Sequence, residues 1–300
     1  MTQTRSSAPA SDHPLGDLRP PGGRGGLVDV FRRRYLLSLL VRKEIRVRYQ
    51  GSVLGLFWSY VRPLLQFTMY FLVLGVILGL RKNVEDFPIH IFSGMVIVHF
   101  FNDTFNNGTR SVVRNKALIR KIKLPREMFP VASLLVSAYH AGPQLLILLV
   151  GSFISGWHPS AMGLVAFALG TAVISVFAMA VALTFSACNV FYRDFQNLVD
   201  TIGILIVWSV PMIYPFSRVI DTAPRWFENI YLSNPLAIAV LLYQQCFWVD
   251  STSDPQATAA SEMPDHLLAR GLGMLALVLV MLVIAQAIFH RLEGRFAERI

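Results

Sequence analysis

Long apolar segments constrain the fold of this chain more than any other feature of its sequence. Several stretches of about 20 residues carry almost no acidic or basic side chains, and that length suits a helix crossing a bilayer. We place six spans at 56–80, 88–107, 131–155, 161–190, 198–219 and 271–290. The sequence therefore predicts an all-α integral membrane protein.

Composition excludes the other broad classes. Of the 300 residues, 54% are hydrophobic and 15% are charged, whereas soluble domains average about 45–50% and about 25%. These values argue against a soluble enzyme and against a disordered chain. Only two cysteines occur, Cys188 and Cys246, so neither a disulfide framework nor a C-x-x-C metal or redox motif is present.

The placement of basic residues predicts the orientation. With the N-terminus in the cytoplasm, the inner segments hold 21 of the 27 Lys and Arg residues, and the outer segments hold five. Cytoplasmic loops are enriched in Lys and Arg, so both termini are expected inside a bacterial inner membrane. The net charge of +9 thus follows a membrane pattern, and we expect no nucleic-acid partner.

The N-terminal region divides into two parts. Residues 1–26 are rich in Ser, Pro, Gly and Arg and predict a disordered cytoplasmic tail. Residues 27–300 form the membrane domain, which begins with the segment 27–50. That segment combines apolar residues at helical spacing with seven basic side chains, which favours an amphipathic helix in the membrane interface. A solvated basic helix is the alternative.

The predicted outer loop 220–270 contains an apolar run at 235–249. Runs of about 10–14 residues are more often re-entrant or interfacial than spanning. Asn234 is a good N-cap and Pro235 a good first helical residue. A seventh span would place the arginine-containing C-terminal tail outside, which the charge distribution disfavours.

Catalytic motifs are absent from the sequence. None of the five lysines follows a glycine, so the chain has no Walker A loop, and neither H-E-x-x-H nor G-x-S-x-G occurs. Five ionisable residues lie near the predicted inner boundary: Arg62, Asp103, Arg193, Asp194 and Asp200. For Arg62, Asp194 and Asp200 a structural ion pair is favoured over proton relay. We predict no catalytic residue, no metal ligand and no cofactor in this chain.

Aromatic residues form a stripe on the first predicted span. Phe57, Tyr60, Phe67 and Phe71 share one helical face together with Leu64. On the fifth predicted span, Trp208 and Tyr214 flank Pro211. Aromatic faces can stack on sugar rings, which suggests a pore lining. Helix packing or an interfacial belt is the alternative.

The cytoplasmic segment 108–130 is strongly basic, with seven basic residues and one acid, Glu127. Its apolar residues recur at helical spacing, and Pro125 and Pro130 end the pattern. A short amphipathic helix of this kind suits docking on a soluble partner. Attraction to anionic membrane lipid is the simpler explanation.

Four blocks of this sequence resemble the ABC-2 type permeases. They are RKEIRVRYQGSVLGLFWSYVRPLLQF, RNKALIRKIKLPREMFPVASLL, NVFYRDFQNLVD, and WSVPMIYPFSRV with SNPLAIAVLLYQQ. They are most similar to polysaccharide exporters of the O-antigen (Wzm-like) and teichoic-acid type. The resemblance implies six spans per subunit and a homodimer with two copies of a cytoplasmic ABC ATPase, in which ATP and Mg²⁺ bind.

The resemblance also implies roles for particular segments. The segment 27–50 resembles an interfacial gate helix, whose diphosphate-binding candidates are Arg42, Lys43, Arg46 and Arg48. A coupling helix that contacts the ATPase would comprise Asn115, Leu118, Ile119, Lys121, Ile122, Lys123, Pro125 and Arg126. First and fifth spans line the channel in this family, which supports the aromatic candidates above, and the run 235–249 resembles outer re-entrant helices.

Together these expectations describe the permease subunit of an ATP-driven exporter. Its substrate would be a polyprenyl-diphosphate-linked polysaccharide: O-antigen, teichoic acid or cell-wall galactan. The alternatives are an ABC-2 exporter of a small lipid or drug, an integral-membrane transferase using Asp194 or Asp200, and a passive channel.

Overall fold

The computed structural model describes residues 26–82, 84–121 and 124–296. Residues 1–25 of the predicted tail lie outside the described residues, as do Ile122 and Lys123 of the predicted coupling helix. All regular secondary structure in the described part of the chain is helical. The predicted all-α class is therefore confirmed.

Four helical segments are long and apolar enough to cross a membrane. The first joins α3 (Trp58–Tyr70) to the π-helical η2 (Phe71–Ile77). The others are α6 (Met128–Ile154), α7 (Ala161–Phe191) and α13 (Leu267–Glu293). A fifth candidate is the pair formed by α10 (Arg225–Leu232) and α11 (Pro235–Phe247), which is bent by 81°. The chain is therefore an integral membrane protein with several spans.

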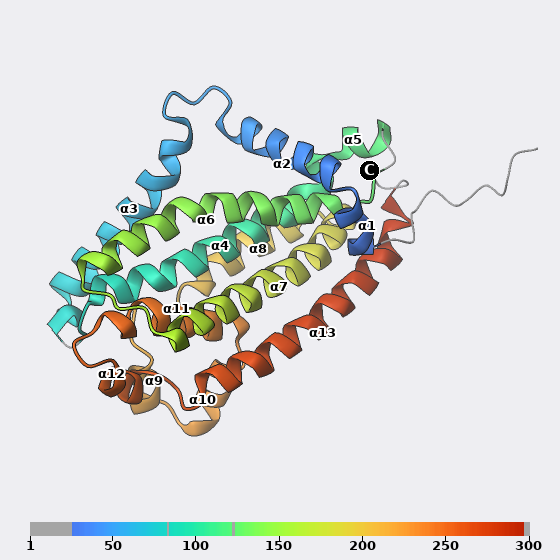
Figure 1. The fold of residues 1–300 in the computed structure, drawn as a ribbon. Helices are drawn as coiled ribbons and strands as arrows, with labels where there is room; N and C mark the ends of the chain where they lie inside the picture. Colours follow the sequence, from blue (N-terminus) through green and yellow to red (C-terminus); the bar gives the residue numbers. More distant parts are fainter. Residues whose placement is uncertain (1–25, 83, 122–123, 297–300) are drawn as a thin grey trace, which may run out of the picture.

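Helix α4 (Phe87–Arg114) is the centre of the bundle and packs against α6, α7 and α11 (Figure 1). It extends seven residues beyond the predicted span 88–107, through the segment that turns polar. Its neighbours cover most of this helix, so most of its residues are buried. Close packing requires Gly108, where an added Cβ would lie 2.6 Å from the Cβ of Ala182 on α7.

Helix α8 (Phe195–Ile206) is shorter than the predicted span 198–219. The sequence leads us to expect that Pro211 and Pro215 kink this span or end it early, and residues 207–216 indeed form turns before α9 (Ser217–Thr222). Pro211 and Pro215 explain the difference. Proline lacks the backbone N–H and clashes with the preceding helical turn, so the helix ends before the first of them.

The N-terminal segment forms two helices, α1 (Gly26–Arg32) and α2 (Arg34–Tyr49). Helix α2 packs against α6, and the chain then turns through 50–54 and the 3₁₀ turn η1 (Gly55–Phe57) into α3. Figure 1 shows that α1, the short α5 (Lys116–Lys121) and the C-terminal end of α13 gather at one end of the bundle.

The opposite end of the bundle contains α9, α10, the 3₁₀ turn η3 (Leu80–Lys82) and α12 (Pro255–Glu262) (Figure 1). Here the predicted start of the apolar run 235–249 is confirmed: Asn234 caps α11 by accepting from the Leu236 N–H at 3.0 Å, and Pro235 is the first residue. After α11 follows the 3₁₀ turn η4 (Val249–Ser251). The indole of Trp248 donates to the Glu85 carbonyl at 2.7 Å and so ties this region to the start of α4.

Candidate functional site

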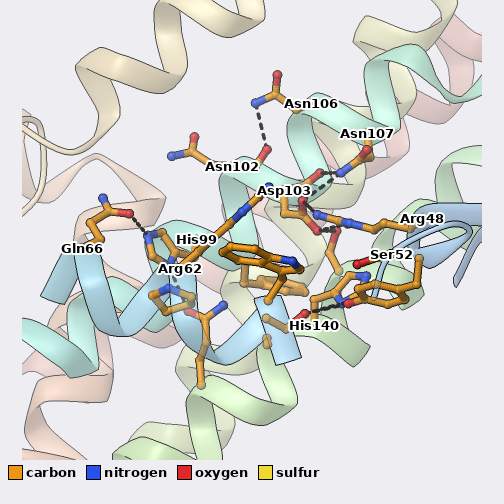
Figure 2. Close-up of a pocket in the computed structure, with 18 of the residues that line it drawn as sticks. Arg48, Ser52, Arg62, Gln66, His99, Asn102, Asp103, Asn106, Asn107 and His140 are labelled. Carbon is orange, nitrogen blue, oxygen red and sulfur yellow. Dashed lines mark hydrogen bonds and ion pairs between the residues drawn. The ribbon is translucent and has the colours of Figure 1, made fainter. Parts of the chain in front are cut away.

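A cavity of about 710 Å³ with a largely polar lining lies between four helices (Figure 2). Its walls are the end of α2, the N-terminal part of α3, and helices α4 and α6. We call it the polar cavity. Its charged and polar lining residues are Arg48, Tyr49, Ser52, Ser59, Arg62, Gln66, His99, Asn102, Asp103, Asn106, Asn107, Arg110, Ser137, His140 and Gln144. Cavities of this size with a few convergent polar groups are typical of ligand sites.

An ion pair joins α2 to α4 at the edge of the polar cavity. Arg48 donates to the two carboxylate oxygens of Asp103 at 2.8 and 3.0 Å. The same carboxylate accepts from Asn107 at 2.9 Å and from Ser137 on α6 at 3.1 Å. Burial opposes the charge of Arg48, but the hydrogen bond and charge of Asp103 outweigh it and raise the Arg48 pKa above its ordinary value. Arg48 is thus already paired with an anion.

Two histidines, which look isolated in the sequence, connect the helices that form the cavity. His99 on α4 lies 3.1 Å from the Gln66 side-chain oxygen on α3 and 2.9 Å from that of Gln144 on α6. His140 on α6 lies 2.8 Å from the Tyr49 hydroxyl at the end of α2. Hydrogen bonds of this kind hold helices together where no water competes. They fix the shape of the cavity wall.

Arg62 and Trp58 of the cavity are accessible to a ligand, and two further polar atoms of its wall lack a partner. Arg62 lies over the Trp58 ring, 5.7 Å from its centre, and the Trp58 side chain is exposed. The Asn102 side-chain oxygen and His140 Nε2 are buried with no hydrogen-bond partner in the described structure. An indole face, a guanidinium and amide groups can stack on sugar rings, bind phosphate oxygens and hydrogen-bond hydroxyls. The arrangement suits binding of a polar ligand.

Arg110, which lines the cavity, forms an ion pair with Asp200 of α8. Arg110 donates to both carboxylate oxygens of Asp200 at 2.7 Å. The structural ion pair that the sequence favours for Asp200 is therefore present. Asp194 lies on the surface just before α8.

The predicted aromatic stripe divides into exposed and packed residues. Phe57 is 57% exposed, and Tyr60 is half-buried. Phe67 stacks with Phe71 at 6.1 Å between ring centres and meets Phe92 of α4 edge-on at 5.2 Å. Helix packing thus accounts for part of the environment of Phe67 and Phe71. Phe57 remains available to line a channel.

Trp208 and Tyr214 line a second cavity, of about 590 Å³, beside α9 and α10. Trp208 is 65% exposed. The Tyr214 hydroxyl donates to the Trp208 carbonyl at 2.9 Å and lies 3.2 Å from the Tyr231 hydroxyl. The structure brings these two predicted residues together, at a place separate from the polar cavity.

The predicted gate and coupling helices touch each other. Lys43 of α2 donates to the Asn115 side-chain oxygen at 2.6 Å, and Asn115 donates to Glu44 at 3.3 Å. Arg114, at the end of α4, pairs with Glu44 at 2.8 Å. Asn115 is buried and precedes α5. A movement of α5 would therefore be transmitted to α2.

The other predicted residues of these two helices lie in mixed environments. Arg42 and Arg46 on α2 and Lys121 on α5 are exposed, whereas Leu118, Ile119 and Pro125 are half-buried. Arg126 donates to the Glu293 backbone carbonyl at the end of α13. The exposed cations are accessible to a partner or to lipid headgroups.

The cavity also contains residues that the sequence analysis missed: Gln66, Asn102, Asn106 and Gln144. A pattern that could have revealed two of them is the spacing of Asn102, Asp103, Asn106 and Asn107, which places two adjacent polar rows along one side of a helix. Gln66 and Gln144 are single amides in apolar segments, and the sequence does not indicate their partners.

Comparison with known proteins gives the family. A model of the ABC-2 type transporter family matches residues 35–248, which include every residue of the polar cavity. The chain belongs to the ABC-2 type transporter family. The family match therefore confirms the resemblance found in the sequence blocks.

Curated relatives within this family match the chain over most of its length. The O-antigen export system permease protein RfbA of Myxococcus xanthus is 26% identical over 272 residues, which is 91% of this chain and 98% of the relative. The protein of the same name from Klebsiella pneumoniae is 27% identical over 270 residues, which is 88% of this chain and 95% of the relative.

Proposed function

We propose that this chain is the transmembrane subunit of an ATP-driven exporter of polyprenyl-diphosphate-linked polysaccharide. The substrate would be O-antigen, teichoic acid or a cell-wall galactan, moved from the cytoplasmic to the outer face. The observation that carries the proposal is the full-length match to O-antigen export permeases. The polar cavity supports it, because a binding site made of amides, arginine and indole suits a glycan better than an apolar drug.

The active assembly we propose is a homodimer of this chain with two copies of a cytoplasmic ABC ATPase. ATP and Mg²⁺ would bind in that partner, and this chain would catalyse no bond change. Six spans would be formed by α3 with η2, α4, α6, α7, α8 with the following turns, and α13. Helix α2 would lie in the membrane interface, and α10 with α11 would form the outer re-entrant pair.

The distribution of charge supports the proposed orientation, with both termini inside. The end of the bundle that contains α1, α2 and α5 carries most of the basic side chains, whereas Arg81, Lys82 and Arg218 are among the few at the opposite end. Because basic residues are retained on the cytoplasmic side, the first end would face the cytoplasm.

Substrate binding would begin at the interfacial helix and continue into the polar cavity. Arg42 and Arg46 are exposed on α2 and would attract the diphosphate. Arg62 would bind phosphate or hydroxyl oxygens, and Trp58 would stack on a sugar ring. Phe57 would extend this surface toward the channel. Contacts that are individually weak would let the glycan slide.

Force would reach the cavity through the contacts that Asn115, directly before α5, makes with α2. ATP-driven closure of the partner would push on α5. Asn115, which directly precedes α5, is hydrogen-bonded to Lys43 and Glu44 of α2. Helix α2 ends at the Arg48–Asp103 pair, on the wall of the cavity. A shift of α2 would therefore change the cavity itself.

The pairing of Asp200 disfavours the transferase alternative. A transferase would need a carboxylate free to act as base or nucleophile, but Asp200 is bound by Arg110 through both oxygens. Asp194 has a solvated position without a neighbouring base in the contacts described here.

The proposal is tested first by purification in mild detergent from native membranes. We expect an ABC ATPase to co-purify in equimolar amount, and its ATPase activity to rise when lipid-linked glycan is added. Absence of an ATPase would contradict the exporter. Stimulation by apolar drugs and not by glycan would instead establish the small-molecule exporter.

A further inference from the structure

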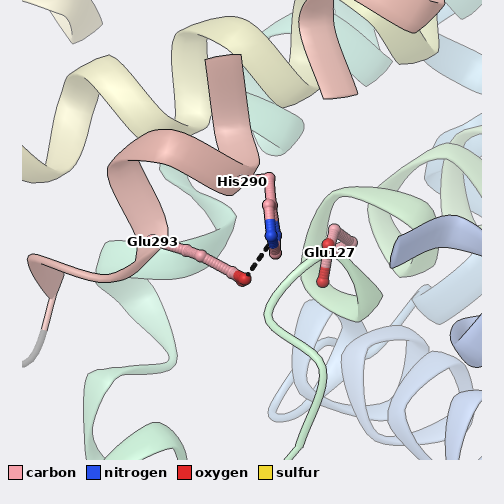
Figure 3. A group of neighbouring side chains, drawn as sticks. All are labelled: Glu127, His290 and Glu293. Carbon is pink, nitrogen blue, oxygen red and sulfur yellow. Dashed lines mark ion pairs between the residues drawn. The ribbon is translucent and has the colours of Figure 1, made fainter. Parts of the chain in front are cut away.

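Three potential metal ligands meet where α6 begins and α13 ends, outside the polar cavity (Figure 3). Glu127 directly precedes α6, and His290 and Glu293 lie in the last turn of α13. One ligand atom from each residue lies within 4.8 Å of the other two. Nδ1 of His290 is 2.9 Å from a carboxylate oxygen of Glu293.

The two carboxylates are buried together. Glu127 is 3% exposed and Glu293 is 8% exposed. Two carboxylates at such a separation repel each other, and burial removes the water that would weaken the repulsion. The site therefore favours either a bound cation or a shared proton.

The neighbouring arginine does not neutralise these carboxylates by direct contact. Arg126 donates to the backbone carbonyl of Glu293, and its guanidinium lies 5.5 Å from the Phe296 ring centre. Among the described residues, Arg126 forms no ion pair within 4.0 Å of either carboxylate, and the cation partner of Glu293 is His290 alone. Protonated His290 would supply one positive charge for two carboxylates.

A fourth polar group independently points into the same place. Gln286 lies four residues before His290, on the same face of α13, and its amide nitrogen donates to Glu127 at 3.0 Å. The amide oxygen of Gln286 is buried and has no hydrogen-bond partner in the described structure. A turn of the amide group would present this unpartnered oxygen to a cation held by Glu127.

We propose that Glu127, His290 and Glu293 bind one divalent transition-metal ion, with Zn²⁺ as the best fit. An imidazole with two carboxylates suits zinc, whereas Mg²⁺ and Ca²⁺ prefer oxygen ligands only. Water would complete four-coordination, or the Gln286 oxygen would do so after its amide group turns over. The His290 side chain is 52% exposed, which gives the ion a path from solvent.

Such an ion would join the first turn of α6 to the last turn of α13. Glu127 directly follows Pro125 and Arg126 of the predicted coupling helix. The ion would therefore hold the C-terminal end of that segment in place. The proposal concerns the metal site alone, and it stands whether or not the transported substrate is a glycan.

The test uses the full-length chain, purified through a tag without histidines, treated with chelator and dialysed. Zinc is titrated in competition with a chromophoric chelator, and the retained metal is measured by elemental analysis. We expect one Zn²⁺ per chain, with affinity lowered about tenfold or more in His290→Gln and in Glu293→Gln. His158→Gln, an exposed histidine elsewhere, should bind as the unmodified chain does.

Thermal unfolding provides the second measurement. Zinc should raise the unfolding temperature of the unmodified chain and of His158→Gln but not that of His290→Gln, whose half-exposed position tolerates substitution. Lack of stoichiometric binding, or equal binding by His290→Gln, would overturn the proposal. Zinc binding by Glu293→Gln with the affinity of the unmodified chain would also overturn it.

Discussion

The polar cavity and the surroundings of α11 use buried polar groups in opposite ways. Eleven of the 13 residues of α11 are buried, and its Gln244 donates to the Pro211 carbonyl at 2.7 Å and lies 3.1 Å from His90. Around α11, buried polar groups thus bond to other protein groups inside a closely packed region. In the cavity, similar groups pair along the walls and still enclose about 710 Å³.

The difference locates stability and binding in separate parts of the molecule. Close packing around α11 gains dispersion and excludes lipid, so side-chain truncation there should cost stability. The charged side chains of the polar cavity lie outside the apolar packing. Their truncation should therefore reduce substrate transport. Four predictions test this separation, in order of decreasing expected effect.

Truncation of Trp248 should have the largest effect on stability. Its side chain is 1% exposed and its indole donates to Glu85. We expect Trp248→Ala to lower the free energy of unfolding by about 3–5 kcal/mol, measured by thermal or denaturant unfolding in detergent. Trp226→Ala is the matched control, because Trp226 is 64% exposed. Equal losses in both variants would refute the proposed role of packing.

Removal of the Asp103 charge should affect both stability and transport. Asp103→Asn leaves the Arg48 guanidinium without its anion, which should cost about 1–3 kcal/mol. A double-mutant cycle with Arg48→Gln measures the coupling between the two. A double variant that loses as much stability as the two single variants added together would show that the pair contributes nothing.

Trp58 and Arg62 should affect transport with little change in stability. Both face the open side of the cavity, so surface-type substitution should change the free energy of unfolding by less than about 0.5 kcal/mol. We expect Trp58→Ala and Arg62→Ala to raise the glycan concentration for half-maximal ATPase stimulation about tenfold, from loss of roughly 1.4 kcal/mol of binding. Phe153→Ala, an exposed aromatic on α6, should leave that concentration unchanged.

The smallest effect on stability is expected from charge reversal in the predicted coupling helix. Lys121 is exposed, and Lys121→Glu with Lys123→Glu should leave membrane insertion and unfolding temperature intact. Export per ATP hydrolysed should fall, because the partner would push less effectively on α5. Transport assays in inverted vesicles measure that ratio. Export at the normal ratio would contradict the coupling role.

Some of the structure follows from local sequence. The apolar runs at 131–155, 161–190 and 271–290 predict helices whose observed ends lie within four residues. Asn234 and Pro235 mark the start of α11, and Pro211 limits α8. These features depend on neighbouring residues alone, through helix capping and the missing proline N–H.

The site was less predictable. Arg48 and Asp103 both stand out as charges near a predicted boundary, but their pairing requires α2 to fold back across α6. Likewise His99 looks isolated until α3 and α6 bring Gln66 and Gln144 to its two ring nitrogens. The predicted aromatic stripe shows the reverse case, since Phe67 and Phe71 share a face by periodicity yet meet Phe92 of α4.

The amino-acid sequence alone was enough to predict a helical membrane protein of the ABC-2 family. It did so because a bilayer requires long apolar helices and because basic loops and short motifs are local properties. Which polar residues meet depends on the folded arrangement of the helices: the polar cavity, the contact of α2 with Asn115 and the Glu127–His290–Glu293 cluster. Those contacts join residues far apart in the chain, and helix packing, which no single segment encodes, selects them.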